Sequence, residues 1–186
     1  MKRKLGALLC ACLAALTLTG CSFRDVMLYL YGGDDFVQGS GEPEYLTYDG
    51  DNGITVCYNA NDWNTPVMQQ QDTISITAGN RLDYTAVLLQ VTDTYTDFLE
   101  QSGEELNAET NTVRYDFSLT VPDASAEAVR YDCGSYQMIF AEIAYDCGTT
   151  LYVSAASRSA DYDPIVELLQ NVYPTGHTPE TAAQAS

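Results

Sequence analysis

The chain has 186 residues, of which 26 are acidic and 8 are basic, and its formal net charge is −18. This charge argues against nucleic-acid binding, because nucleic-acid affinity comes largely from lysine and arginine side chains that neutralise phosphates. The length allows one domain with a hydrophobic core, and a hydrophobic content of 46% argues against a disordered chain. The single histidine, His177, falls near the C-terminus, which argues against most histidine-based catalysis and against zinc chemistry.

The first 20 residues have the pattern of a secretory signal peptide. Lys2, Arg3 and Lys4 form a basic start, and residues 5–18 form an apolar stretch of 14 residues. This stretch is too short for a membrane-spanning helix but is typical of the hydrophobic region of a signal peptide. After removal of residues 1–20, the mature chain has 26 acidic residues, 5 arginines and no lysine, which gives a net charge of −21.

Residues 18–21, Leu-Thr-Gly-Cys, directly follow the apolar stretch and resemble the bacterial lipobox. The resemblance implies that Cys21 becomes the first residue of the mature protein and carries a thioether-linked diacylglycerol, usually with a fatty acid such as palmitate on its amine. Two or more acyl chains anchor a protein stably, so the predicted location is the extracytoplasmic face of the cell membrane. An ordinary signal peptide, with Cys21 incidental, is the less favoured alternative. Residues 21–43 thus comprise the lipidated cysteine and a tether, with an apolar run at 26–31.

The folded domain is expected over residues 44–174, and residues 175–186 are predicted to be a disordered tail. Its predicted elements are strands at 45–48, 54–58, 73–77 and 84–92, a helix whose apolar face is Tyr95, Phe98, Leu99, Ser102 and Leu106, strands at 113–121, 128–132, 135–145 and 150–156, and a short helix with Ile165, Leu168, Leu169 and Val172.

Turn and cap residues support several of these boundaries. The turn-rich segment 49–53 joins the first two strands as a β-hairpin. Asp93 or Thr94 is a suitable N-cap for the middle helix. The last helix has Asp163 as its expected cap and Pro164 at its first position, where proline is tolerated.

The strand at 135–145 is apolar on both faces, which is typical of a central strand that is covered on both sides. Two helices are available to cover it. The sequence therefore predicts an α+β fold with a single antiparallel sheet between helices.

This order of elements resembles the PsbP-like family, which has an α/β/α sandwich. The strongest local resemblance is residues 53–63, where a strand runs into a loop with the only tryptophan, Trp63, although the proline usual in that loop is absent. A second resemblance is residues 148–153, followed by Asp161 and the last helix. The family is named for an extrinsic subunit of the photosynthetic oxygen-evolving complex, and the resemblance implies a non-catalytic binding or assembly module.

Three cysteines of the folded domain, Cys57, Cys133 and Cys147, lie in an oxidising compartment. If 135–145 is one strand, Cys133 and Cys147 lie about 36 Å apart at its opposite ends, against the roughly 6 Å of a disulfide. A bond from Cys57 to either of the others and three free thiols are both consistent with the sequence. A cysteine nucleophile needs a nearby base, usually histidine, and His177 is a poor candidate.

Paired carboxylates are the remaining enzymatic option. Glycoside hydrolysis needs two carboxylates roughly 5–10 Å apart, and nothing in the spacing singles out one pair. Trp63 beside Asp62 and Asn61 is a candidate sugar-binding platform, although a lone tryptophan in such a loop more often anchors the loop to the core.

A calcium site is a further hypothesis, because Asp49, Asp51 and Asn52 supply hard oxygen ligands in one turn. The spacing is not that of an EF-hand, since Gly53 stands where the third side-chain ligand belongs. A plain hairpin turn explains these residues better.

The sequence therefore predicts a membrane-anchored extracytoplasmic lipoprotein whose domain binds an envelope protein or another envelope component without catalysis. The alternatives are a carboxylate-dependent hydrolase acting on envelope glycans and a calcium-responsive structural module.

Overall fold

The computed structural model describes residues 42–79, 84–92, 95, 97–109, 112–159 and 161–177. These residues all belong to the second of two compact units of the chain, which runs from Gly33 to Ser186. The predicted signal peptide, Cys21, the tether as far as residue 41 and the tail beyond residue 177 lie outside the described residues, as do Asp93 and Thr94. Neither helix in the described ranges has the length and apolar character that a membrane crossing requires.

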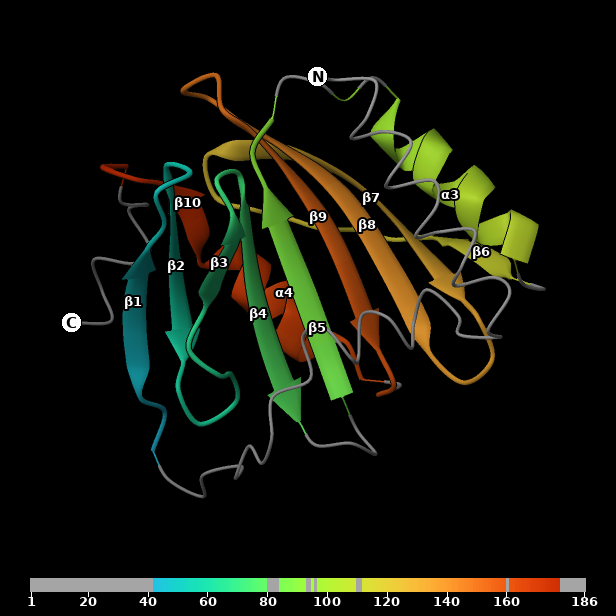
Figure 1. The fold of residues 1–186 in the computed structure, drawn as a ribbon, viewed down its shortest axis with the longest axis horizontal. Helices are drawn as coiled ribbons and strands as arrows, with labels where there is room; N and C mark the ends of the chain where they lie inside the picture. Colours follow the sequence, from blue (N-terminus) through green and yellow to red (C-terminus); the bar gives the residue numbers. More distant parts are fainter. Residues whose placement is uncertain are drawn as a thin grey trace. The chain divides into compact units, whose positions relative to one another are not determined.

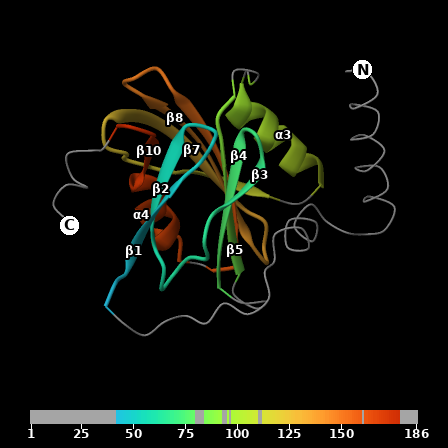
Figure 2. The same ribbon diagram turned by 60° about the vertical axis from the view of Figure 1, so that its left-hand side comes forward.

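Two antiparallel sheets form the described domain (Figures 1 and 2). The large sheet has seven strands in the order β3-β4-β5-β9-β8-β7-β6, and the small sheet has three in the order β1-β2-β10. The strands are β1 (Tyr45–Asp49), β2 (Ile54–Asn59), β3 (Val67–Gln70), β4 (Thr73–Gly79), β5 (Tyr84–Gln90), β6 (Val113–Asp116), β7 (Ala124–Asp132), β8 (Gln137–Tyr145), β9 (Thr150–Ser157) and β10 (Val172–Pro174). The helices within the described residues are α3 (Phe98–Glu109) and α4 (Asp163–Gln170).

Strand β8 lies at the centre of the hydrophobic core. It pairs with β7 on one side and with β9 on the other. Its alternate residues belong to two separate clusters, with Ile139 and Ile143 in the larger one and Met138 and Phe140 in the smaller one. The prediction of a central strand covered on both faces is therefore confirmed for this segment.

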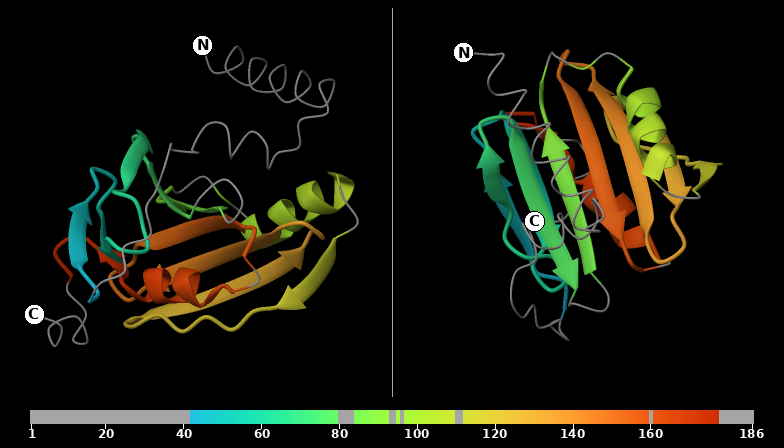
Figure 3. Two further views of the ribbon diagram at one scale, coloured as in Figure 1. Left: turned by 90° about the horizontal axis from the view of Figure 1, so that it is seen from below. Right: turned by 45° about the vertical axis from the view of Figure 1, so that its right-hand side comes forward.

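Helix α3 packs on one face of the large sheet (Figure 3, right). Phe98 of α3 contacts Phe140 and Tyr152 edge to face, with ring centroids 6.1 and 5.1 Å apart. The helix approaches β7 closely at Gly103, where an added Cβ atom would overlap the hydroxyl of Tyr131. The absence of a side chain at this position therefore allows α3 to lie close to the sheet.

The opposite face of the large sheet is covered by α4 and by the small sheet (Figure 3, left). Leu168 and Leu169 of α4 are buried in one cluster with Val56 of β2. The phenol of Tyr145 in β8 donates a hydrogen bond of 2.6 Å to the backbone oxygen of Val172 in β10. This buried bond joins the two sheets directly.

The predicted fold class, a single antiparallel sheet between helices in a PsbP-like α/β/α sandwich, is wrong. The domain consists mostly of strands, and its helices have only 12 and 8 residues. The predicted hairpin is present as β1 and β2, but it pairs with β10 and forms a second sheet. Val172, which was expected on the last helix, belongs to β10. A strand of three residues is too short for an alternating pattern to reveal it.

Smaller differences concern the ends of elements. The strand expected at 113–121 ends after four residues as β6. The segment that follows β6 contacts α4, because Gln170 Nε2 of this helix donates a hydrogen bond of 3.2 Å to the backbone oxygen of Thr120. The N-cap of α4 is Tyr162 and not Asp163, and the Tyr162 side chain makes no cap hydrogen bond. The backbone N–H of Asp163 instead donates a hydrogen bond of 3.0 Å to Asp161 Oδ1. Strand β3 was not expected, because its four residues are also too few to show a period.

Two buried tyrosines make the domain sensitive to high pH. Burial raises the pKa of the Tyr84 phenol to about 12 and also raises the pKa of the Tyr145 phenol, whereas a tyrosine in an unfolded chain has a pKa of about 10. Folding keeps both phenols neutral, so their contribution to stability is complete below about pH 10 and is lost as the pH rises through about 12. The described domain contains no lysine that would titrate in the same window.

We therefore expect cooperative unfolding in this alkaline window. The last tyrosines to ionise should show their tyrosinate absorbance over the same pH range in which the circular dichroism is lost. Tyr84→Phe should move the midpoint to higher pH, because one of the neutral phenols that the fold protects is gone. Complete ionisation of all tyrosines before any change in circular dichroism would contradict this expectation.

Candidate binding site

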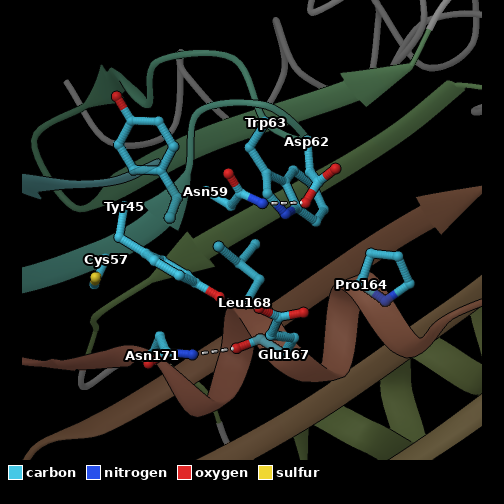
Figure 4. A pocket seen from close by; sticks show the side chains of 10 residues that line it. Tyr45, Cys57, Asn59, Asp62, Trp63, Pro164, Glu167, Leu168 and Asn171 are labelled. Carbon is cyan, nitrogen blue, oxygen red and sulfur yellow. Dashed lines mark hydrogen bonds between the residues drawn. The ribbon is translucent and has the colours of Figure 1, made fainter. Parts of the chain in front are cut away.

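A small pocket opens between the β1–β2 hairpin, the turn after β2 and helix α4 (Figure 4). Its volume is about 90 Å³, compared with the roughly 300–1,000 Å³ of ordinary small-molecule sites. Segments from the beginning and the end of the domain line it together. The lining residues are Tyr45, Cys57, Tyr58, Asn59, Asp62, Trp63, Pro164, Glu167, Leu168 and Asn171.

Asn59 holds the turn that carries Asp62 and Trp63. Its backbone oxygen accepts hydrogen bonds from the backbone N–H groups of Asp62 and Trp63 at 3.0 and 2.9 Å. Its side-chain Oδ1 accepts from the backbone N–H groups of Glu44 and Asn61, both at 3.1 Å. Its Nδ2 donates to Asp62 Oδ2 at 2.6 Å. One side-chain amide therefore shapes the turn, orients a carboxylate and ties the start of β1 to the end of β2.

Helix α4 supplies the second carboxylate of the pocket, Glu167. Tyr45 Oη donates a hydrogen bond of 2.8 Å to Glu167 Oε1, and this bond spans from strand to helix. Asn171 Nδ2 donates to the backbone oxygen of Glu167 at 2.8 Å (Figure 4). The bond to the Glu167 carboxylate, together with partial burial, raises the pKa of the Tyr45 phenol above its usual value.

Cys57 is the thiol of the pocket, and it is half-buried. Burial raises its pKa, and a hydrogen bond with the Thr47 side chain acts in the opposite direction with a smaller effect. A nucleophilic cysteine needs a lowered pKa, because the thiolate is the reactive form. Cys57 is therefore a neutral hydrogen-bonding group at neutral pH.

The pocket is negatively charged. Asp62 and Glu167 are its two carboxylates, and none of its ten lining residues is basic. Their hydrogen-bond donors are neutral groups, the Asn59 amide and the Tyr45 phenol, so these bonds do not cancel the charge. Such a site suits an ammonium, guanidinium or hydroxyl group and repels an anion.

The structure places the three binding residues suggested by the sequence in different settings. Asp62 lines the pocket. Trp63 also lines it, but only 4% of this residue is exposed and its ring packs in the main core, so a sugar cannot stack on its face. Asn61 does not line the pocket. Its side chain is engaged elsewhere, since Nδ2 donates a hydrogen bond of 2.8 Å to the backbone oxygen of Glu42.

Sequence patterns missed Tyr45, Glu167 and Asn171 as pocket residues. Tyr45 and Glu167 are 122 positions apart, so no local motif connects them. An acidic residue on an amphipathic helix is usually a solvated surface residue. The only available signal was the four-residue spacing of Glu167 and Asn171, which places them on one side of the chain at the end of α4.

The suggested calcium ligands lie in the hairpin turn between β1 and β2. Asp49 Oδ1 accepts a hydrogen bond of 2.6 Å from Thr55 Oγ1, and Asn52 Nδ2 donates one of 3.2 Å to the backbone oxygen of Asp72. Within the part of the chain that the structure describes, no group of three or more histidine, cysteine or acidic residues is placed to hold a metal ion. A calcium site at Asp49, Asp51 and Asn52 stays a prediction that gains no support from these contacts.

No disulfide links the three cysteines of the described domain, Cys57, Cys133 and Cys147. Cys133 precedes β8 and Cys147 follows it, so the two residues flank the same strand. Hydrogen bonds with the backbone and the side chain of Thr149 lower the pKa of the exposed Cys147 thiol. The structure therefore contains three separate thiols with different surroundings and no cross-link between them.

No protein-family model matches this sequence, and no curated protein matches it significantly. The resemblance to the PsbP-like family gains no support from these comparisons, and the α/β/α sandwich that it implies is not the observed fold.

Replacing Asn59 by alanine should destabilise the domain more than the same change at Asn61. Asn59→Ala removes three side-chain hydrogen bonds, one of them to the half-buried carboxylate of Asp62. We therefore expect a loss of about 1–3 kcal/mol in the free energy of unfolding. Asn61→Ala removes one exposed bond to Glu42, and we expect a loss below about 0.5 kcal/mol. Urea denaturation of both variants measures the difference, and equal losses would contradict the role assigned to Asn59.

Proposed function

We propose that this protein is a lipid-anchored, non-catalytic binding module on the extracytoplasmic face of the cell membrane, and that it binds an envelope protein or another envelope component at the pocket beside β1. The signal-peptide pattern of residues 1–20 and the lipobox-like residues that end at Cys21 support the location. The binding role is supported by the composition and exposure of the pocket.

The observation that carries the binding role is an exposed tyrosine at a negatively charged pocket. Tyr45 is 46% exposed although its hydroxyl is bound to Glu167, and the neighbouring Leu46 is 42% exposed. Exposed large side chains next to oriented polar groups are typical of contact surfaces, and tyrosine is enriched in them.

The size of the pocket favours a group that belongs to a macromolecule. A volume of about 90 Å³ fits one side chain or one substituent and is small for a whole metabolite. The raised pKa of Cys57 also argues against thiol chemistry there. The pocket is better suited to hold part of a partner than to carry out a reaction on it.

Site-specific photo-crosslinking on intact cells tests this function. A photoreactive amino acid at Leu46, next to Tyr45 on the exposed strand β1, should capture one or two reproducible envelope partners, identified by mass spectrometry. The matched control carries the same amino acid at Val113, which is 54% exposed on β6 of the other sheet, and should not capture them. A Cys21→Ala form should leave the membrane fraction and lose the capture, because it lacks the acceptor for lipid.

Capture of the same partners from Leu46 and from Val113, or from neither, would contradict binding at this pocket. If Cys21→Ala stays in the membrane fraction, the lipid anchor is contradicted. Binding at the pocket is then judged from the comparison of capture at Leu46 with capture at Val113.

Glycan hydrolysis is a second candidate, because the pocket brings Asp62 together with another carboxylate, Glu167. Two carboxylates that flank a glycosidic bond are the usual requirement for its hydrolysis. The small volume and the buried Trp63 make a sugar chain a poorer fit than a single side chain. Release of soluble fragments from envelope glycan, abolished by Asp62→Asn, would establish this candidate, and no release by the unmodified protein would reject it.

A further inference from the structure

The two sheets of the described domain have four edge strands, β1, β10, β3 and β6, and the β10 edge is blocked. Pro174 has no N–H group to offer a further strand. The backbone oxygen of Val172 already accepts the hydrogen bond from Tyr145. A proline and an occupied acceptor leave little for another chain to pair with.

Both edges of the large sheet are also protected. Strand β3 has four residues, and its register shifts between Met68 and Gln70. Strand β6 has four residues and carries two charged side chains, Arg114 and Asp116, which lie 4.0 Å apart. Short length, irregular register and charge are common features that prevent pairing between edge strands.

Strand β1 is the outer strand of the small sheet (Figures 1 and 2), and it has neither the register shift of β3 nor the proline of β10. It has five residues in continuous register with β2, and four of the five are exposed. Bonds at its two ends fix the direction of its backbone groups, because Ala60 N donates to Glu44 O at 2.7 Å and Gly50 N donates to Ile54 O at 2.8 Å. Hydrogen-bonded pairs alternate along antiparallel strands, so these two pairs define the pattern between them.

The alternation directs Leu46 and Tyr48 toward β2 and directs the backbone N–H and C=O groups of Tyr45, Thr47 and Asp49 away from it. In the described ranges, β2 is the only strand that pairs with β1. These outward groups form a row of donors and acceptors along an exposed strand, which is the arrangement that accepts a further strand.

Charge indicates what kind of strand this edge would accept. From Glu42 to Gly79 the sequence has six acidic residues and no lysine, arginine or histidine. Glu44 and Asp49, at the two ends of β1, are exposed. A second copy of the chain would place acidic side chains near acidic ones across a β1–β1 pair, which is unfavourable. A segment with lysine or arginine would meet complementary charge.

We propose that the β1 edge binds an extended basic segment of a partner protein, which joins the small sheet as an added strand. This inference rests on the binding function proposed above and specifies the chemistry of the partner. Backbone hydrogen bonds to Tyr45, Thr47 and Asp49 supply affinity that does not depend on sequence, and the side chains of the added strand supply specificity.

The pocket lies on the face toward which basic side chains of the added strand would project. Tyr45, Thr47 and Asp49 share one face of β1, and from this face Tyr45 reaches Glu167. The added strand would lie about 4.8 Å from β1, with its residues opposite Tyr45 and Thr47 on the same face. Lysine or arginine there would approach the carboxylates of Glu167 and Asp62.

Thr47→Pro is the variant that tests the edge. It removes the central outward N–H group and leaves the β1–β2 hydrogen bonds intact, because Thr47 does not donate to β2, and proline is tolerated on edge strands. Thr47→Val is the matched control, since it keeps the N–H group and, like proline, lacks the hydroxyl that bonds Cys57. The probe is a short capped peptide of alternating threonine and arginine with a fluorescent label, and its counterpart has glutamate in place of arginine.

Fluorescence anisotropy with the purified full-length protein should show that the arginine peptide binds the unmodified protein and Thr47→Val alike. Thr47→Pro should bind it at least about tenfold more weakly, because a backbone hydrogen bond at the centre of the added strand is lost. Binding should weaken as the salt concentration rises, and the glutamate peptide should not bind.

Equal binding of the arginine peptide to Thr47→Pro and Thr47→Val would overturn the inference, since general charge attraction is the same in both variants. If Thr47→Pro fails to fold, as judged by circular dichroism, an arginine peptide with methylated backbone nitrogens takes its place. Binding of that peptide as tight as the unmethylated one would equally overturn the inference.

Crosslinking in cells separates this inference from the proposed function. Capture from Leu46 that persists unchanged in Thr47→Pro would overturn the added strand while the binding function stands. No capture in any form would overturn the binding function itself. A concentration-dependent dimer in sedimentation that Thr47→Pro abolishes would assign the edge to a second copy and overturn the basic partner.

Discussion

The pairing of β10 with β2 is the constraint on which the rest of the domain depends. β10 has only three residues, yet it completes the small sheet. Tyr145 fixes it to the large sheet through a hydrogen bond of 2.6 Å to the backbone oxygen of Val172. Without β10 the hairpin would be a two-stranded ribbon, which is marginally stable on its own. The short strand therefore connects the hairpin, the last helix and the central strand β8.

This pairing also determines where the pocket forms. Asn171 follows α4 directly, and its backbone oxygen accepts a hydrogen bond of 2.9 Å from the backbone N–H of Cys57 in β2. Glu167 lies about one helical turn earlier and thus comes within hydrogen-bonding distance of Tyr45. A phenol and a carboxylate that are 122 positions apart meet because the end of the helix is held against β2. Since β10 occupies one side of β2, β1 is left as the outer strand.

The elements that the sequence predicts correctly have local signals. The hairpin has turn residues between two β-prone runs, and β8 has apolar residues on both faces. The second sheet was not predicted, because strand β10 has no local signal. The spacing of Val172 from Leu169 continues the apolar side of the helix, and a strand of three residues is too short to show a period of its own. The pocket was predictable only in part. Asp62 and Trp63 follow a recognisable strand, whereas Glu167 becomes a pocket residue through a tertiary contact that no local pattern encodes.

Hydrogen exchange along β1, resolved by residue with NMR on the full-length protein, tests most directly whether this strand is an open edge. We expect protected amides at Leu46 and Tyr48, which bond to β2, and fast exchange at Tyr45, Thr47 and Asp49, which point away from it. An alternating pattern would support a free row of backbone groups beside the pocket. Uniform protection of all five amides would show that the edge is already covered and would contradict its role as a docking strand.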